Sequence, residues 1–232
     1  MTGCLGAGSR GIVGRHMARS DETTAENRPR RSDGTRQGWD RRYAAADRIH
    51  ATPVPNRFLV SEISDLAPGT ALDLACGAGR NAVWLAARGW RVTGVDFSGV
   101  ALGIARDLAA SNGVEVEWVE SDVIGWAPPA RAFDLVCALY LQLPAPERRA
   151  ALRHAVDALR PGGTLLVIGH DLLNMTEGWG GPTAPDVLFT PDDIAAEVGD
   201  LQVEKAERVR RPAEDGGVLR EAIDALVRAR RP

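Results

Sequence analysis

The chain has few cysteines, a single lysine and no long apolar run. Its three cysteines, Cys4, Cys76 and Cys137, show no metal-ligand spacing and form no even-numbered disulfide framework, so we expect reduced thiols and no bound metal. No run of about 18 apolar residues occurs, which predicts no membrane span. The N-terminus lacks the apolar segment of a secretion signal. Together these absences predict a cytoplasmic protein.

Charge is distributed unevenly along the sequence. Residues 1–38 hold seven arginines and four acidic residues, whereas the remainder carries a formal charge of −6. Nucleic-acid contacts normally require a basic face, so the acidic remainder predicts no nucleic-acid partner. Residues 1–36 are rich in Gly, Ser, Thr and Arg without apolar periodicity, which predicts a disordered basic tail with Met17 as an alternative start. Residues 37–232 are long enough for one α/β domain.

Strand and helix patterns alternate through most of this domain. Such alternation predicts a mostly parallel sheet of about seven strands with helices on both faces, and two closing strands read as an antiparallel β-hairpin. Trp39–Ile49 is expected to form a short helix or a lid. The expected strands are 70–76, 90–96, 114–120, 133–139, 164–169, 201–211 and 219–229, and the expected helices are 54–66, 80–88, 99–111, 146–159 and 190–199.

Two of these strands end on carboxylates beside a glycine turn. Asp73 comes four residues before Gly77 in the run Ala71–Asn81, and Asp96 lies 19 residues after Gly77. A carboxylate at the position of Asp96 suits ribose hydroxyls in a βαβ unit. Asp73 would repel a pyrophosphate but suits a nucleoside with a positive charge, and position 82 lacks the third glycine of a dinucleotide fingerprint. The pattern therefore favours a cationic nucleoside over a nicotinamide dinucleotide.

These residues resemble the class I S-adenosylmethionine-dependent methyltransferases, a family with a Rossmann-like sheet and a terminal antiparallel hairpin. The run from Asp73 to Gly79 is similar to the family's first motif, and Val95–Ser98 is similar to its second. A narrower resemblance, carried by Cys76–Asn81 with Trp39, Asp40 and Tyr43, is to the small bacterial tellurite-resistance and thiopurine-type methyltransferases. The resemblance implies S-adenosylmethionine as cofactor and the following cofactor-binding residues: Asp73, Ala75, Gly77, Gly79, Asn81, Asp96, Phe97, Asp122, Val123 and Leu139.

The sequence says less about the residues that would bind the molecule that accepts the methyl group. Many members of the family carry a histidine just past the fourth strand, whereas this chain has Tyr140 and Gln142 there. His170 ends the fifth strand, where it is a candidate proton acceptor or, equally, a loop anchor. Residues 172–189 form a long connection that predicts a lid. Tyr140 is a further catalytic candidate, and the candidate substrate-binding residues are Trp39, Tyr43, Gln142 and Trp179.

The resulting hypothesis is methyl transfer from S-adenosylmethionine to a small molecule: a thiol, an oxyanion or a hydroxylated metabolite. Two alternatives stay open, because methyl transfer needs no signature acid or nucleophile. One is a non-catalytic S-adenosylmethionine-binding sensor or scaffold, and the other, disfavoured by Asp73, is a nicotinamide-dependent oxidoreductase. We expect a monomer or a homodimer with no membrane partner.

Overall fold

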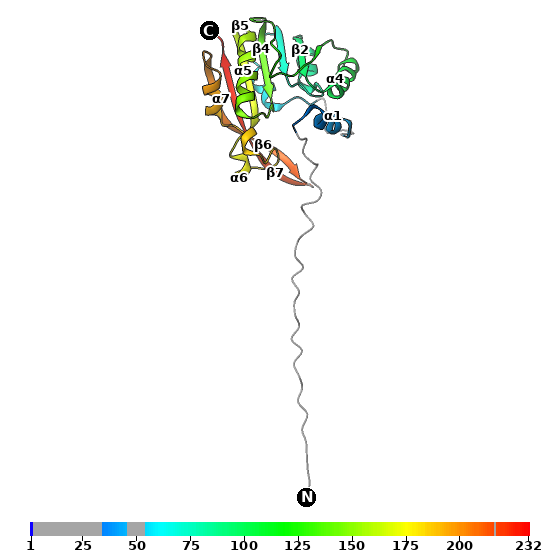
Figure 1. Ribbon diagram of the computed structural model, residues 1–232, viewed down its shortest axis with the longest axis vertical. Coiled ribbons are helices and arrows are strands. Elements are labelled where there is room, and N and C mark those ends of the chain that lie inside the picture. The colour runs from blue at the N-terminus through cyan, green and yellow to red at the C-terminus, as the bar shows by residue number, and fades with distance from the viewer. Residues whose placement is uncertain (2–33, 46–53, 216) are drawn as a thin grey trace. The chain divides into compact units, whose positions relative to one another are not determined.

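Seven strands form one sheet in the order β3-β2-β1-β4-β5-β7-β6 (Figure 1). The computed structural model describes residues 1, 34–45, 54–215 and 217–232. Strands β1 to β5 are parallel, and β7 runs antiparallel to both β5 and β6. The strands are β1 (Thr70–Leu74), β2 (Arg91–Asp96), β3 (Glu117–Glu120), β4 (Phe133–Leu139), β5 (Leu159–His170), β6 (Gln202–Asp215) and β7 (Val218–Arg230).

Helices connect the parallel strands and cover both faces of the sheet. The α-helices are α1 (Arg36–Ala45), α2 (Arg57–Glu62), α3 (Arg80–Ala86), α4 (Gly99–Ser111), α5 (Ala145–Ala158), α6 (Asn174–Glu177) and α7 (Pro191–Glu197), with a 3-10 helix η1 (Pro185–Val187). Local sequence fixes several of their starts. Ser98 caps α4 through Ala101, and Thr190 and Asp193 form a capping box at α7.

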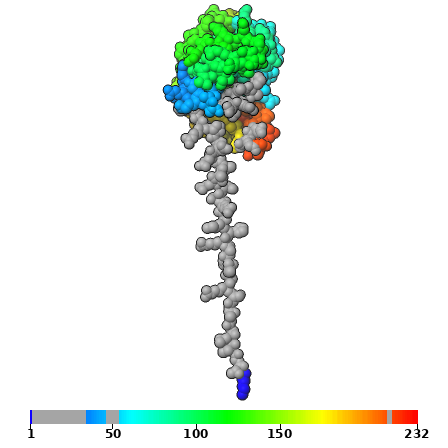
Figure 2. Space-filling view, turned by 90° about the vertical axis from the view of Figure 1, so that its right-hand side faces the viewer, coloured from blue at the N-terminus to red at the C-terminus, as the bar shows by residue number. Residues whose placement is uncertain are grey.

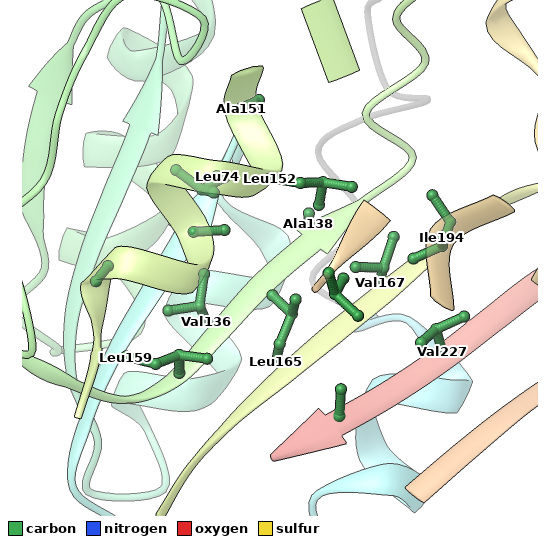
Figure 3. Packing of buried hydrophobic residues seen from close by; sticks show 14 of the residues in the cluster. Leu74, Val136, Ala138, Ala151, Leu152, Leu159, Leu165, Val167, Ile194 and Val227 are labelled. Atoms are coloured by element: carbon green, nitrogen blue, oxygen red, sulfur yellow. The ribbon is translucent and has the colours of Figure 1, made fainter. Parts of the chain in front are cut away.

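The sheet separates two apolar clusters, because side chains alternate between its faces along each strand. On one face, α5 and α7 cover inward-pointing residues of β4, β5 and β7, and Figure 3 shows Leu152 and Ile194 over Val136, Leu165 and Val227. The other cluster, to which α2 and α3 contribute, includes alternate residues of the same strands. A rigid doubly covered sheet of this kind fixes the positions of the loops at its edges.

The predicted fold class is confirmed, and the differences lie at element ends. Strand β5 begins at Leu159, because Phe133 pairs with Leu159 before the register shifts. The hairpin is longer than predicted, since pairing continues to Asp215 and Val218. Residues 2–33, which include Met17 and nearly all of the predicted tail, lie outside the described residues, and Arg36 begins α1. Among the helices that are described, none combines the length and the apolar character needed to cross a membrane.

Candidate cofactor and acceptor site

The first part of the site is the loop between β1 and α3. Strand β1 lies between β2 and β4, the point at which strand order reverses and ligands bind in open α/β sheets. Three residues of this loop have left-handed backbone: Ala75 at φ 54°, Gly77 at φ 54° and Gly79 at φ 77°. The two glycines adopt that conformation without the steric cost that a side chain incurs. The loop therefore turns sharply beside the carboxylates.

Asp73 is a buried carboxylate that lacks a partner on one side. Its side chain is 1% exposed, and Oδ2 has no hydrogen-bond partner among the described residues. Burial raises the pKa of Asp73 from its ordinary 3.8 to about 7, while Arg80 and the backbone N–H of Ala82 oppose the rise and Asp96 adds to it. A buried oxygen without a partner is unusual in a folded protein and fits a cationic ligand group that completes it.

Asp96 holds the glycine loop against β2. Its Oδ2 accepts a hydrogen bond from Gly77 N at 2.8 Å, and its Oδ1 accepts one from Ser98 N at 2.9 Å. Burial raises the pKa of Asp96, although these backbone hydrogen bonds oppose the rise and nearby Asp40 adds to it. Each carboxylate oxygen has lone pairs beyond the one used, so Asp96 retains capacity for ribose hydroxyls.

Helix α1 is fastened over this loop. Ser98 Oγ lies 2.5 Å from Asp40 Oδ1, and Arg36 Nη1 lies 2.7 Å from Glu120 Oε1. The Tyr43 hydroxyl lies so close to Gly77 that a Cβ at Gly77 would collide with it. Helix α1 packs against α4, and Figure 2 shows α1 in blue against green atoms of the domain. Tyr43, predicted to bind substrate, therefore lies at the glycine loop of the cofactor site.

Of four other predicted cofactor-binding residues, one is exposed and three are buried. Asp122 is exposed after β3 and accepts a hydrogen bond from Ile124 N at 3.0 Å, which is a turn contact that leaves it open to solvent. Val123 is buried beside it. Asn81 is also buried, but its Oδ1 accepts from Asn56 N at 2.9 Å, so it anchors the segment before α2. Leu139 is 7% exposed at the end of β4.

The acceptor-side candidates form a polar cluster with a residue that sequence reasoning missed, Asp224 of β7. Tyr140 donates a hydrogen bond to Asp224 Oδ2 at 2.7 Å and accepts one from Arg211 Nε at 3.0 Å. Arg211 Nε also lies 2.7 Å from Asp224 Oδ2. His170 Nδ1 lies 3.3 Å from Asp224 Oδ1. The Tyr140 hydroxyl thus uses its hydrogen and one lone pair within the protein, whereas no described residue is hydrogen-bonded to Nε2 of His170.

Hydrogen bonds connect the segment after β5, for which the sequence predicts a lid, to Gln142 and join its two ends. Gln142 accepts from His170 N at 2.8 Å and donates to Val187 O at 2.6 Å. Leu172 N donates to Phe189 O at 3.3 Å, which joins the two ends of the segment. Asn174 fixes its interior to Gly180 O at 2.8 Å. Trp179, in the same segment, stacks against Arg220, whose guanidinium carbon lies 5.0 Å from the ring centroid.

Trp39, the remaining predicted substrate-binding residue, lies on α1, where its ring centroid is 5.8 Å from that of Tyr43.

Sequence reasoning also missed Arg80, Asp40 and Arg211. Arg80 begins α3, is half-buried, and has no ion-pair or hydrogen-bond partner within the part of the chain that is described. Its position directly after the glycine turn was a readable signal. A local sequence signal also marked Asp224, because it is the acidic residue within an otherwise apolar stretch of β7. Asp40 belongs to the residues that carry the narrower resemblance, with no role assigned to it there, and nothing local in the sequence marked Arg211.

Comparison with known proteins shows which proteins the chain is similar to. Residues 71–163 match a family model described as a methyltransferase domain. Over 104 residues the chain is 38% identical to demethylmenaquinone methyltransferase of Thermus thermophilus, covering 44% of this chain and 47% of the relative. It is 32% identical over 152 residues to trans-aconitate 2-methyltransferase of an Azoarcus strain, covering 60% and 58%. The chain thus spans about half the length of the curated relatives it matches.

Solved structures show the same fold. The N-methyltransferase NodS from Bradyrhizobium japonicum, in complex with S-adenosyl-L-homocysteine, superposes with a TM-score of 0.68 at 22% identity, covering 86% of this chain and all of that one. TehB from Haemophilus influenzae gives 0.63 at 16% identity, covering 78% and 64%. The narrower resemblance to tellurite-resistance and thiopurine-type enzymes stays a prediction. Residues 71–163 therefore match a methyltransferase domain, the chain is similar in sequence to the methyltransferases named above, and its fold is that of these solved structures.

Proposed function

We propose that this protein transfers a methyl group from S-adenosylmethionine to a small-molecule acceptor. The observation that carries the proposal is Asp73, whose buried Oδ2 has no hydrogen-bond partner among the described residues. An ammonium group supplies both the hydrogen bond and the positive charge that this oxygen lacks. A nicotinamide dinucleotide would place its pyrophosphate at the glycine turn and the helix N-terminus, where the Asp73 carboxylate would repel it.

The chain's own residues divide the work of holding the cofactor. Asp73, Ala75, Gly77 and Gly79 bind the methionine portion, with Arg80 placed to pair with its carboxylate. Asp96 binds the ribose, and the residues expected at the adenine are Phe97, Asp122, Val123 and Leu139. S-adenosylmethionine supplies an activated methyl group on a positively charged sulfur. The protein contributes orientation of the two reactants and exclusion of water, for which the segment after β5 and helix α1 are suited.

The acceptor is proposed to be a thiol, an oxyanion or a hydroxylated metabolite. The matched relatives carry names with diverse acceptors, including trans-aconitate and a small-subunit ribosomal RNA. The formal charge of −6 beyond residue 38 favours a small molecule over RNA, because a phosphate backbone attracts basic proteins. A cytoplasmic monomer or homodimer is the expected setting.

Isothermal calorimetry with S-adenosylmethionine, S-adenosylhomocysteine and NAD tests the proposal. We expect micromolar binding of the first two ligands and none of NAD. The Asp73→Asn variant should lose most of that binding, because the neutral amide no longer offsets the ammonium charge. Binding of NAD alone would overturn the proposal. Tight cofactor binding without turnover of thiols, oxyanions or phenols would favour a sensor or scaffold instead.

A further inference from the structure

Asp224 is a charged residue in the buried part of β7. Its side chain is fully buried, and its neighbours Ala222, Ile223, Ala225 and Leu226 are buried apolar residues. Placing a carboxylate here costs desolvation that an apolar residue would avoid, so the fold alone gives no reason for it. The antiparallel register places Asp224 directly opposite His170, at the carboxyl end of β5. This end of the parallel strands is where ligands bind in such folds.

The contacts of Asp224 bear on which ring nitrogen of His170 carries the hydrogen. Burial alone would raise the pKa of Asp224, but His170, Arg211 and Tyr140 together hold it below its ordinary value, so the carboxylate is ionised. Its Oδ2 is used by Tyr140 and Arg211, each at 2.7 Å. Its Oδ1 lies 3.3 Å from His170 Nδ1, and neither atom has a regular hydrogen-bond partner in the described structure. An ionised carboxylate only accepts hydrogen bonds, so the His170 ring can donate to Asp224 only when its hydrogen is on Nδ1.

With a hydrogen on Nδ1 alone, the His170 ring presents Nε2 as a hydrogen-bond acceptor. No described residue is hydrogen-bonded to Nε2, and the His170 side chain is 12% exposed. The ring lies 5.1 Å from the Tyr140 ring, between centroids. Its other neighbour is Gly181, at φ 75°, where a Cβ would come within 2.7 Å of Nδ1. The imidazole therefore lies against the Tyr140 ring and Gly181, and its Nδ1 faces Asp224.

We propose that Asp224 is a positioning residue that makes His170 Nε2 the general base of this site, and that the acceptor is consequently a hydroxyl compound. The inference rests on the proposed methyltransferase function. During transfer, the hydroxyl proton moves to Nε2, and the oxygen's electron pair forms the new bond to the methyl carbon. The resulting imidazolium is stabilised by ionised Asp224, while the methyl donor leaves as a neutral thioether.

The chemistry of the alternatives explains the choice of a hydroxyl. A carboxylate is already ionised at neutral pH, and a thiol loses its proton near pH 8.5, so neither needs a buried carboxylate–histidine pair. A phenol or alcohol keeps its proton at neutral pH and must lose it during transfer. A positioned base contributes about 10²- to 10⁴-fold to such reactions.

Asp171 provides a matched control for Asp224. Both carboxylates are fully buried, and each is paired with an arginine of β6: Arg208 Nε lies 3.0 Å from Asp171 Oδ1. Asp171 Oδ1 also accepts from Leu173 N at 2.7 Å, so it anchors the segment after β5. Like Asp224→Asn, Asp171→Asn removes the charge of a buried carboxylate that pairs with an arginine of β6, and it leaves the contact between Asp224 and the His170 ring in place.

The first test is ¹⁵N NMR of the histidine ring nitrogens at pH 7.5, with His170→Asn used to assign the signals. We expect the hydrogen of His170 on Nδ1 in the wild-type protein, a loss of that preference in Asp224→Asn, and no change in Asp171→Asn. A wild-type His170 that carries its hydrogen on Nε2 overturns the proposal. This readout needs neither an acceptor nor a bound cofactor.

The second test measures methyl transfer to phenol, catechol and hydroquinone, with thiophenol and benzoate as comparison acceptors. We expect transfer to at least one hydroxyl compound, a fall of about 100-fold or more in His170→Asn, a fall of about 10-fold or more in Asp224→Asn, and little change in Asp171→Asn. Transfer only to thiophenol or benzoate, or to none, overturns the hydroxyl assignment. Calorimetric binding of S-adenosylhomocysteine shows separately whether the proposed function stands.

Discussion

Ser98 Oγ lies 2.5 Å from Asp40 Oδ1 and also accepts a hydrogen bond from Ala101 N at 3.1 Å. One hydroxyl therefore joins helix α1 to the N-terminus of α4. The backbone N–H of the same residue donates to Asp96 at 2.9 Å. Asp96, helix α4 and helix α1 thus meet at Ser98, so the position of α1 and the position of the Asp96 carboxylate depend on each other.

Replacing Ser98 with alanine should loosen α1 as well as destabilise the domain. Loss of the cap costs about 1 kcal/mol, which lowers Tm by about 2–4 °C for a domain of this size. Hydrogen exchange in residues 36–45 should become faster, and S-adenosylhomocysteine should bind more weakly. Thr190→Ala removes a comparable cap from α7 and serves as the control. Equal α1 exchange in the two variants would show that the Asp40 contact does not hold α1.

Cofactor binding should depend on pH through Asp73. Its pKa of about 7 means that the carboxyl group is largely neutral at pH 6 and largely ionised at pH 7.5. An ammonium ligand prefers the ionised form, so the affinity for S-adenosylhomocysteine should rise by up to about tenfold between these pH values. Calorimetry in two buffers of different ionisation enthalpy should detect proton release at pH 6. A pH-independent affinity without proton release would place the ammonium elsewhere.

The same group should make the free protein less stable as pH rises. Because the folded pKa of about 7 exceeds the ordinary 3.8, Asp73's stabilising contribution is complete below about pH 4 and is lost as pH passes 7. The difference corresponds to about 4 kcal/mol. Asp73→Asn should therefore raise Tm at pH 8 but hardly at pH 5, while weakening cofactor binding. A variant equally destabilised at both pH values would contradict this account.

Arg80 should contribute to cofactor affinity through charge. Its guanidinium acts on both Asp73 and Tyr43 but forms no ion pair or hydrogen bond with a described residue. A ligand carboxylate would give the Arg80 guanidinium an ion-pair partner, and a hydrogen bond to a charged group contributes about 1.5–3 kcal/mol to the free energy of binding. Arg80→Ala should weaken S-adenosylhomocysteine binding by about 10- to 100-fold. Arg88→Ala, which removes a guanidinium stacked 3.9 Å from the Trp84 ring centroid, should leave the affinity unchanged.

Local sequence was sufficient for the sheet and for the two carboxylates beside the glycine turn. Asp73 near the end of one strand, a glycine turn, and a second strand that ends on Asp96 lie within one stretch of chain, and their spacing determines their geometry. Asn81 shows the limit of this reasoning. Its position allowed a cap or a ligand contact, whereas its partner is Asn56, on a segment that local pattern did not connect with it.

The acceptor side depended on contacts that local patterns do not contain. The pairing of His170 with Asp224 follows from the β5–β7 register, and Arg211 reaches the pair from β6. A charged residue in an apolar strand signals that some partner exists but does not identify it. Helix α1 poses the same problem, because Tyr43 meets Gly77 only after α1 has packed against α4.

The contact between Tyr43 and Gly77 gives a test with an internal rescue. Gly77 has φ 54°, and a Cβ there would collide with the Tyr43 hydroxyl. Gly77→Ala should therefore displace α1, lower Tm and weaken S-adenosylhomocysteine binding. In the double variant Gly77→Ala/Tyr43→Phe the hydroxyl is gone, so α1 protection in hydrogen exchange should partly return, while the cost of the left-handed backbone persists. If the double variant recovers no protection, the loss arises from backbone strain in the loop, and Tyr43 does not set the position of α1.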